Sequence, residues 1–213
     1  MTKQTAIALG TWAWGDTSDG KVFGDQLTVE ELQPVVDEAM ANGFNLWDTA
    51  YAYGAGASES MLGTVLQAYP RDSYQLSTKF TPQMASNGEH EVADMLAGSL
   101  KRLKPDYVDI YWIHNPGDVE KWTPELIPLV QSGKIKRVGV SNHNLDQIKR
   151  VNEILGTAGI QISAVQNYYS LLYRSSEKAG IIDYCREHDI TFFAYMVLEQ
   201  GALSGHYDVQ HPL

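Results

Sequence analysis

The sequence predicts an α/β protein in which short apolar strands alternate with amphipathic helices. Segments that are apolar on both faces, such as 108–113 and 191–195, are typical of a parallel sheet covered on both sides. Alternating units imply either a doubly wound sheet or a (β/α) barrel, and periodicity alone does not separate the two. Seven strand candidates follow one another about 27 to 37 residues apart, which suits one βα unit each. They begin near Ile7, Phe44, Tyr74, Val108, Arg137, Ala164 and Thr191.

Several predicted helices carry start or stop signals between these strands. Residues 28–31 form a capping-box pattern, and an apolar face at helical spacing follows it. Thr123 before Pro124 predicts a helix that begins there, and Asn144 with Gln147 predicts the start of another. Glycines stand where helices should stop, at Gly43, Gly133 and Gly159.

The composition is that of an ordinary globular protein of one domain. Of its 213 residues, 44% are hydrophobic and 20% are charged. The net charge of -10 argues against a nucleic-acid partner, which needs a basic surface. No stretch approaches the roughly 20 apolar residues that span a bilayer. Residues 1–5 show no signal-peptide pattern, so we expect a cytoplasmic protein without a membrane partner.

Cysteine and histidine give little indication of thiol or metal chemistry. The single cysteine, Cys185, cannot form an internal disulfide, and it lies in an apolar helical stripe where a buried small side chain is expected. None of the six histidines has another ligand at the short spacing of a metal site, so no metal is expected.

Polar or charged residues end five successive predicted strands. They are Asp48, Lys79, His114, the pair Ser141 and Asn142, and Gln166. In a barrel the carboxyl ends of the strands surround one mouth, where barrel enzymes place their chemistry. Taken singly, each residue has an ordinary explanation, such as a helix cap, a solvated strand end or a loop histidine. Their occurrence at one strand end after another predicts a shared polar cavity.

An aspartate, a lysine, a histidine and a nearby tyrosine in one cavity predict acid catalysis. A lysine ammonium beside the Tyr53 hydroxyl would stabilise the phenolate and lower the pKa of that phenol from about 10. Asp48 would keep Lys79 charged and fixed. The phenol could then donate a proton to a carbonyl oxygen near neutral pH, while His114 hydrogen-bonds the same oxygen and orients it.

The segment around this tyrosine resembles the signature of the aldo-keto reductase superfamily. The matching residues are Asp48-Thr49-Ala50-Tyr51-Ala52-Tyr53-Gly54, followed by Ser58-Glu59. The resemblance implies a (β/α)8 barrel and an oxidoreductase that converts a small-molecule carbonyl substrate into an alcohol. It implies that Tyr53 is the general acid, with Asp48, Lys79 and His114 as its catalytic partners.

The same resemblance implies a nicotinamide cofactor, NADP(H), and names its contacts. In chain order these are Gly10, Thr11, Trp12, Asp48, Ser141, Asn142, Gln166, Tyr195 and Leu198. Ser141, Asn142 and Gln166 match the residues that hold the carboxamide, and Tyr195 matches the aromatic residue that stacks on the nicotinamide ring. No glycine-rich phosphate motif follows the first strand, which disfavours a Rossmann fold.

The sequence departs from the family pattern chiefly towards its carboxyl end. Seven strands are found where a complete barrel has eight, so we expect a single domain over residues 1–213 that lacks the eighth βα unit. The family's basic cluster for the adenosine phosphate would lie beyond Leu213, which leaves NADH as an alternative cofactor. The open edges of the first and seventh strands could pair with a second copy of the chain.

Three functions follow from these observations. An active reductase is favoured by the intact set of four catalytic residues. A cofactor-sensing regulatory subunit on the same fold and a truncated, catalytically impaired barrel are the alternatives. For the reductase, the positions of Trp14, Tyr51 and Trp112 predict aromatic walls suited to apolar aldehydes or ketones, although Trp112 could equally belong to the core.

Overall fold

Seven parallel strands form one sheet in the computed structural model, which describes residues 7–14, 27–86, 88–208 and 210–212. Each strand pairs with its neighbours in sequence, in the order β1 to β7. They are β1 (Leu9–Gly10), β2 (Leu46–Asp48), β3 (Gln75–Phe80), β4 (Val108–Ile113), β5 (Ile135–Ser141), β6 (Ile162–Tyr168) and β7 (Thr191–Tyr195). Every predicted start lies within about two residues of an observed strand start. The prediction made for residues 1–5 lies outside the described residues.

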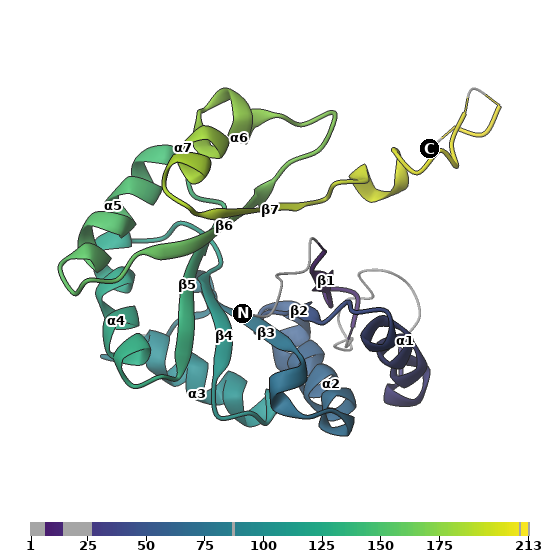
Figure 1. Cartoon of the computed structure of the whole chain (residues 1–213), viewed down its shortest axis with the longest axis horizontal. Helices are drawn as coiled ribbons and strands as arrows, with labels where there is room; N and C mark the ends of the chain where they lie inside the picture. The colour runs from purple at the N-terminus through teal and green to yellow at the C-terminus, as the bar shows by residue number, and fades with distance from the viewer. Residues whose placement is uncertain (1–6, 15–26, 87, 209, 213) are drawn as a thin grey trace.

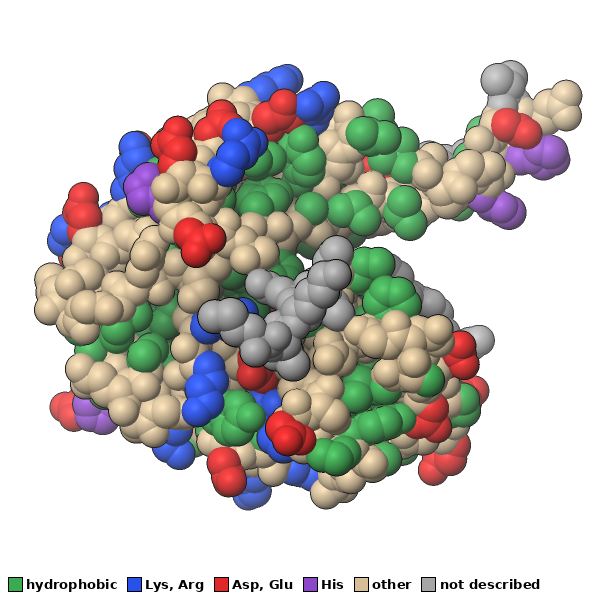
Figure 2. All heavy atoms as spheres, viewed as in Figure 1, with side chains coloured by type: hydrophobic (Ala, Val, Ile, Leu, Met, Phe, Trp, Pro, Cys, Tyr) green, Lys and Arg blue, Asp and Glu red, His purple; other side chains and the backbone are tan. Residues whose placement is uncertain are grey.

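The sheet curls, and helices cover its outer face, as Figure 1 shows. The helices are α1 (Val29–Ala41), α2 (Ala57–Val65), α3 (Glu91–Leu103), α4 (Val119–Gln131), α5 (Leu145–Gly156), α6 (Ser175–Lys178) and α7 (Ile181–Glu187). Within the described part of the chain, β1 pairs only with β2 and β7 only with β6. The architecture is therefore an incomplete (β/α)8 barrel, as predicted. In Figure 2 the molecule is hollowed between the arm that carries β7 and the part that carries α1.

Most of the hydrophobic core lies between the sheet and its outer helices. Trp47 and Tyr111 project from the strands into this core, where Leu62 and Leu96 of the helices are also fully buried. A second, small cluster lies apart from that core and consists of Ile110, Trp112 and Ala164, with Phe193 packed against it. Because side chains alternate along a strand, the neighbours Tyr111 and Trp112 belong to different clusters.

Helix starts follow the predicted signals, with one exception. The predicted capping box at the start of α1 is confirmed, and α5 begins after Asn144 as predicted, where Gln147 completes a second capping box. The helix predicted to begin at Thr123 begins earlier, at Val119. Asp118 caps it instead, because its carboxylate accepts a hydrogen bond from the backbone N–H of Lys121 at 3.1 Å. Pro124 consequently lies inside α4 rather than at its first position.

The parallel register aligns the polar strand ends. Asp48 is paired with Ser77, and Ser141 is paired with Gln166. Lys79 lies two residues after Ser77 and therefore projects from the same face of the sheet. The fold thus collects these side chains at one end of its inner face. No helix in the described ranges is long and apolar enough to cross a membrane.

Candidate active site

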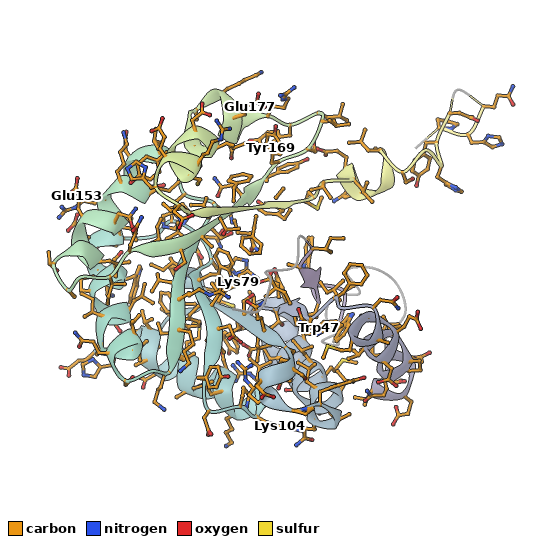
Figure 3. All side chains as sticks on the ribbon, viewed as in Figure 1. Trp47, Lys79, Lys104, Glu153, Tyr169 and Glu177 are labelled. Carbon is orange, nitrogen blue, oxygen red and sulfur yellow. The ribbon has the colours of Figure 1, made fainter. Side chains whose placement is uncertain are left out.

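The carboxyl ends of the strands surround a cavity of about 550 Å³. Its lining includes nine residues that the sequence singled out: Gly10, Trp12, Asp48, Tyr53, His114, Ser141, Asn142, Gln166 and Tyr195. Ala13, Ala52 and Met196 complete the lining. Figure 3 shows Lys79 inside the curl of the sheet, whereas Lys104 and Glu153 lie on the periphery. The predicted polar cavity is therefore present.

Lys79 links the other ionisable groups and is fully buried. Its ammonium donates to Asp48 Oδ2 at 2.6 Å, to the Thr49 carbonyl at 2.7 Å and to the Tyr53 hydroxyl at 3.4 Å. Three N–H donors therefore meet three oxygen atoms. Burial opposes the charge, but the attraction of Asp48 and Tyr53 outweighs it and raises the pKa of Lys79. Lys79 is thus a cation at neutral pH.

Asp48 is held on both carboxylate oxygens. Its Oδ2 accepts from Lys79 and also from Gln166 Nε2 at 3.1 Å, and its Oδ1 accepts a short hydrogen bond from the Ser77 hydroxyl. Ser77 was not predicted as a site residue, although the two-residue repeat of a strand, counted back from Lys79, places it on the same face. Gln166 was predicted to contact a cofactor, and here its amide N–H also fixes Asp48.

Tyr53 lies on a sharply turned segment that follows β2. It begins the short 3-10 helix Tyr53–Gly56, in which residues 54–56 all have positive φ angles. At Gly56 the φ angle is 93°, and an added Cβ would lie 2.6 Å from Arg102 Nε, so this position requires glycine. The Tyr53 ring packs edge-on against His114, with 5.8 Å between the ring centroids.

A buried ion pair supports the segment that carries Tyr53. Glu59 at the start of α2 is fully buried, and its carboxylate accepts from Arg102 Nε at 2.7 Å and from the Thr78 hydroxyl at 2.5 Å. The Arg102 guanidinium also lies 4.7 Å from the centre of the Tyr51 ring. These contacts tie α2 to α3 and β3, and thereby fix the position of the tyrosine segment.

The pKa of Tyr53 differs from the prediction in its net direction. Burial is the largest influence and raises the pKa, Lys79 lowers it, and Asp48 raises it, so that the pKa lies above its ordinary value. The predicted influence of Lys79 is present, but burial outweighs it because a phenolate removed from water is costly. Tyr53 is therefore a protonated donor at neutral pH.

His114 is a neutral imidazole at neutral pH. Burial, and then the nearby Lys79 ammonium, lowers its pKa to about 4. Its Nδ1 lies 3.0 Å from the Thr81 hydroxyl, and its carbonyl accepts from Asn142 Nδ2 at 2.9 Å. A neutral imidazole at the cavity wall carries one N–H, which can donate to a bound oxygen.

Asn142 and Tyr195 form a connected part of the cavity wall. Asn142 has a left-handed φ of 61°, and its side-chain oxygen accepts from the Tyr195 hydroxyl at 2.6 Å. Its Nδ2 donates to Asn115 Oδ1 at 3.1 Å in addition to the His114 carbonyl. The Tyr195 ring stacks on that of Tyr168, with 5.7 Å between centroids. The Asn142 amide is therefore already engaged within the protein.

The three aromatic residues predicted to wall the substrate pocket do not line this cavity. Trp14 is buried in the outer core against Trp47, and Tyr51 lies beside the Arg102 guanidinium. Trp112 belongs to the small inner cluster, which was its alternative interpretation. The aromatic rings that line the cavity are instead those of Trp12, Tyr53 and Tyr195, together with the His114 imidazole. The turn after β1 places Trp12 on the cavity and Trp14 in the core.

Two predicted cofactor contacts also lie outside the cavity lining. Thr11 is fully buried, and its hydroxyl forms a hydrogen bond with Ser58 at 2.8 Å. Leu198 follows β7 and is 55% exposed.

Among the described residues, no group of three or more histidine, cysteine, aspartate or glutamate side chains could hold a metal ion. Cys185 is buried, and burial raises the pKa of its thiol to about 11, which makes it a poor nucleophile.

Comparison with protein families and curated proteins identifies clear relatives. The model of the Aldo/keto reductase family matches residues 6–212. The chain is 31% identical over 209 residues to the aldo-keto reductase YhdN of Bacillus subtilis, covering 93% of this chain and 60% of that protein. It is 32% identical to the NADH-specific methylglyoxal reductase of Escherichia coli, covering 93% of this chain and 65% of the relative. The chain thus spans less than two thirds of these relatives.

Solved structures of similar proteins share the fold. An aldo-keto reductase from Klebsiella pneumoniae in complex with NADPH superposes with a TM-score of 0.80 at 27% identity, covering 97% of this chain and 68% of that structure. The thermostable aldo-keto reductase Tm1743, in complex with the inhibitor epalrestat, gives a TM-score of 0.80 at 28% identity, covering 93% of this chain and 70% of that structure.

Proposed function

This chain belongs to the aldo/keto reductase family, and we propose that its cavity reduces an aldehyde or ketone to an alcohol with a reduced nicotinamide cofactor. The observation that carries the proposal is the contact between Lys79 and Tyr53 at the wall of the cavity. A buried ammonium beside a phenol is costly to maintain and is the arrangement that acid catalysis by tyrosine needs.

The cavity suits a nicotinamide ring. Ser141 and Gln166 place polar side chains on its wall, and Tyr195 places a flat ring on the same wall. These are the groups expected to hold a carboxamide and to stack on an aromatic ring. The cofactor, when bound, supplies a hydride to the carbonyl carbon. NADPH is proposed because related structures hold it, and NADH is the alternative because one relative is NADH-specific.

The chain's own side chains supply the proton and hold the carbonyl oxygen. Tyr53 donates its hydroxyl proton to that oxygen, and its raised pKa keeps the proton in place until the oxygen becomes basic. Lys79 stabilises the phenolate that remains, while Asp48 holds the ammonium in position. His114 donates its N–H to the same oxygen.

Part of the cavity lining is apolar. Trp12, Ala13, Ala52 and Met196 contribute to this part without a charged group. These four positions favour an apolar aldehyde or ketone, because they offer no polar side-chain partner to replace the hydration of a charged substrate. We therefore propose apolar carbonyl compounds as the substrate class.

The substitution Tyr53→Phe tests the proposed acid directly. It removes the donor but keeps the ring, so we expect carbonyl reduction to fall by roughly 10²–10⁴-fold, the usual contribution of general acid catalysis. Cofactor binding should stay nearly unchanged. Turnover is measured by oxidation of NADPH, and binding by quenching of tryptophan fluorescence, for which Trp12 at the cavity wall is the reporter.

Tyr107→Phe is the matched control, because Tyr107 precedes β4 at the opposite end of the strands and packs against Arg71. It should retain full activity. Full turnover in Tyr53→Phe would contradict the assignment of the acid. Quenching without turnover in the unaltered protein would favour a cofactor-sensing regulatory subunit, and no quenching at millimolar NADPH or NADH would contradict cofactor binding.

A further inference from the structure

Thr81 lies directly behind His114, outside the group of residues that line the cavity. It follows the last residue of β3 and is only 5% exposed. Its hydroxyl lies 3.0 Å from His114 Nδ1, and its backbone N–H donates to Met95 Sδ at 3.3 Å. The backbone of His114 is fixed from the same strand, because its N–H donates to the Phe80 carbonyl at 2.8 Å. The two side chains therefore face each other from adjacent, well-anchored positions.

The direction of this hydrogen bond follows from the surroundings of the Thr81 hydroxyl. A buried hydroxyl proton needs an acceptor. Across the ranges that the structure describes, the only partner of Thr81 Oγ1 is His114 Nδ1. If Nδ1 carried the imidazole proton, the threonine proton would have no acceptor. With Thr81 as the donor, Nδ1 accepts and both groups are satisfied.

We propose that Thr81 is a positioning residue that holds neutral His114 in the tautomer with its proton on Nε2. The ring nitrogen left for the cavity is then an N–H donor. The opposite tautomer would present a lone pair to the lone pairs of a bound carbonyl oxygen, and that contact is repulsive. Because the pKa of His114 is lowered to about 4, the ring has one proton at neutral pH and its tautomer decides between attraction and repulsion.

The tautomer can be measured without substrate. In the full chain labelled with ¹⁵N-histidine, the two ring nitrogens give distinct resonances, and the signals of His114 are identified as those missing from His114→Gln. We expect a protonated Nε2 and an unprotonated Nδ1 that accepts a hydrogen bond. In Thr81→Val the Nδ1 resonance should move to that of an unbonded nitrogen, and Thr81→Ser should restore its position.

Thr123→Val is the matched control. Thr123 is fully buried, and its hydroxyl has no hydrogen-bond partner within the described residues, so its loss should leave the His114 resonances unchanged. A protonated Nδ1 in the unaltered chain would overturn the proposal. An Nδ1 resonance that does not move in folded Thr81→Val would overturn it too. Should Thr81→Val fail to fold, the ring-nitrogen resonances of His114 in the unaltered chain and in Thr81→Ser still show which tautomer is present.

The consequence for the reaction rests on the proposed function. In Thr81→Val we expect kcat for carbonyl reduction to fall roughly tenfold, the effect of one lost hydrogen bond, with the KM for cofactor unchanged. Thr81→Ser should recover most of the rate. An unaltered chain with the expected tautomer but no reductase activity would contradict the proposed function and leave the role of Thr81 supported.

Discussion

At the scale of single residues, the site keeps a full positive charge away from water. Lys79 is 0% exposed, and the favourable contact that offsets its desolvation is the ion pair with Asp48 at 2.6 Å. Burying such a pair seldom adds stability, and well-packed apolar residues often do better. The pair therefore fits the proposed role of Lys79 beside the Tyr53 phenol better than it fits a contribution to folding.

A second buried residue, His143, makes stability depend on pH. Burial lowers its pKa to about 4, and its Nδ1 bonds the Ser141 carbonyl at 2.7 Å. Because the folded pKa lies below the unfolded value of about 6.5, the full stability is present above pH 6.5 and is lost as the pH falls towards 4. His114 acts in the same direction.

We therefore expect His143→Leu to weaken the acid sensitivity of the fold. Between pH 6.5 and 4 the unaltered protein should lose about 3 kcal/mol of unfolding free energy through this histidine, a loss that the variant avoids. Urea unfolding at several pH values measures the difference. An equal pH dependence in the two proteins would show that the pKa of His143 is the same in the folded and unfolded states.

The sequence could predict the ionisable residues of the site because each ends a strand or follows one closely. Neutral hydroxyl residues such as Ser77 and Thr81 were missed, since in an apolar strand they look like ordinary core positions. Their roles depend on register, which brings Ser77 opposite Asp48. The pKa of Tyr53 was predicted in the wrong direction because the sequence names the charged neighbour but not the depth of burial.

At the scale of elements, a close contact between α2 and α3 lies beside the segment that carries Tyr53. Gly63 of α2 packs against the backbone of α3, where an added Cβ would lie 2.4 Å from the Arg102 carbonyl oxygen. The same α3 residue forms the ion pair with Glu59 in the first turn of α2. The helices can approach this closely only because position 63 has no side chain.

Gly63→Ala should therefore destabilise the protein by about 1–3 kcal/mol, because the obstructing atoms are backbone and cannot rotate away. Gly156→Ala is the control, since Gly156 ends α5 and a Cβ added there would meet no heavy atom within 4 Å. That change should stabilise by about 0.4–1 kcal/mol. Urea unfolding compares the two, and equal midpoints would contradict the tight contact.

Helix boundaries were predictable where a side chain caps the backbone close to its own position. The capping box of α1 and the start of α5 at Asn144 were predicted for this reason. The start of α4 was predicted too late because proline is typical of the first turn of a helix. Pro124 therefore placed the predicted start at Thr123, whereas the helix is capped by Asp118. The choice between Asp118 and Thr123 as the cap depends on how α4 packs against the sheet, and the local sequence does not predict that packing.

At the scale of the whole molecule, β1 and β7 are the outer strands of the sheet that the described residues form. β1 has two residues and β7 has five, and in the described ranges neither pairs on its outer side. Ile7 and Val197, which lie near these edges, are 51% and 50% exposed. Unpaired edges beside exposed apolar residues favour association between chains.

We expect the chain to self-associate through the edge of β7. Ala194 is an exposed residue of that strand, and Ala194→Lys should lower the associated fraction because a charge on an edge opposes pairing. Light scattering over a range of concentrations measures the mass. Gln131→Lys at the exposed end of α4 adds the same charge elsewhere and should have no effect. A monomer at every concentration would contradict this expectation.

The choice between a barrel and a doubly wound sheet was beyond the periodicity of the sequence. Both folds alternate strands and helices, and both bury apolar strands on two faces. What separates them is strand order, which here runs from β1 to β7 without a reversal. The barrel was predicted from the resemblance to the aldo-keto reductase superfamily, and a Rossmann fold was disfavoured because no glycine-rich phosphate motif follows the first strand.

The same consecutive order determines when each part of the chain can find its partners. A strand that pairs with the one before it needs nothing that has yet to be synthesised, so the sheet can grow one unit at a time as the polypeptide leaves the ribosome. The hydrogen bond from Gln166 to Asp48 spans 118 residues, so it cannot form until Gln166 has been synthesised. The sheet can thus begin to assemble before β6 is made, whereas the contact that holds Asp48 from Gln166 forms only afterwards.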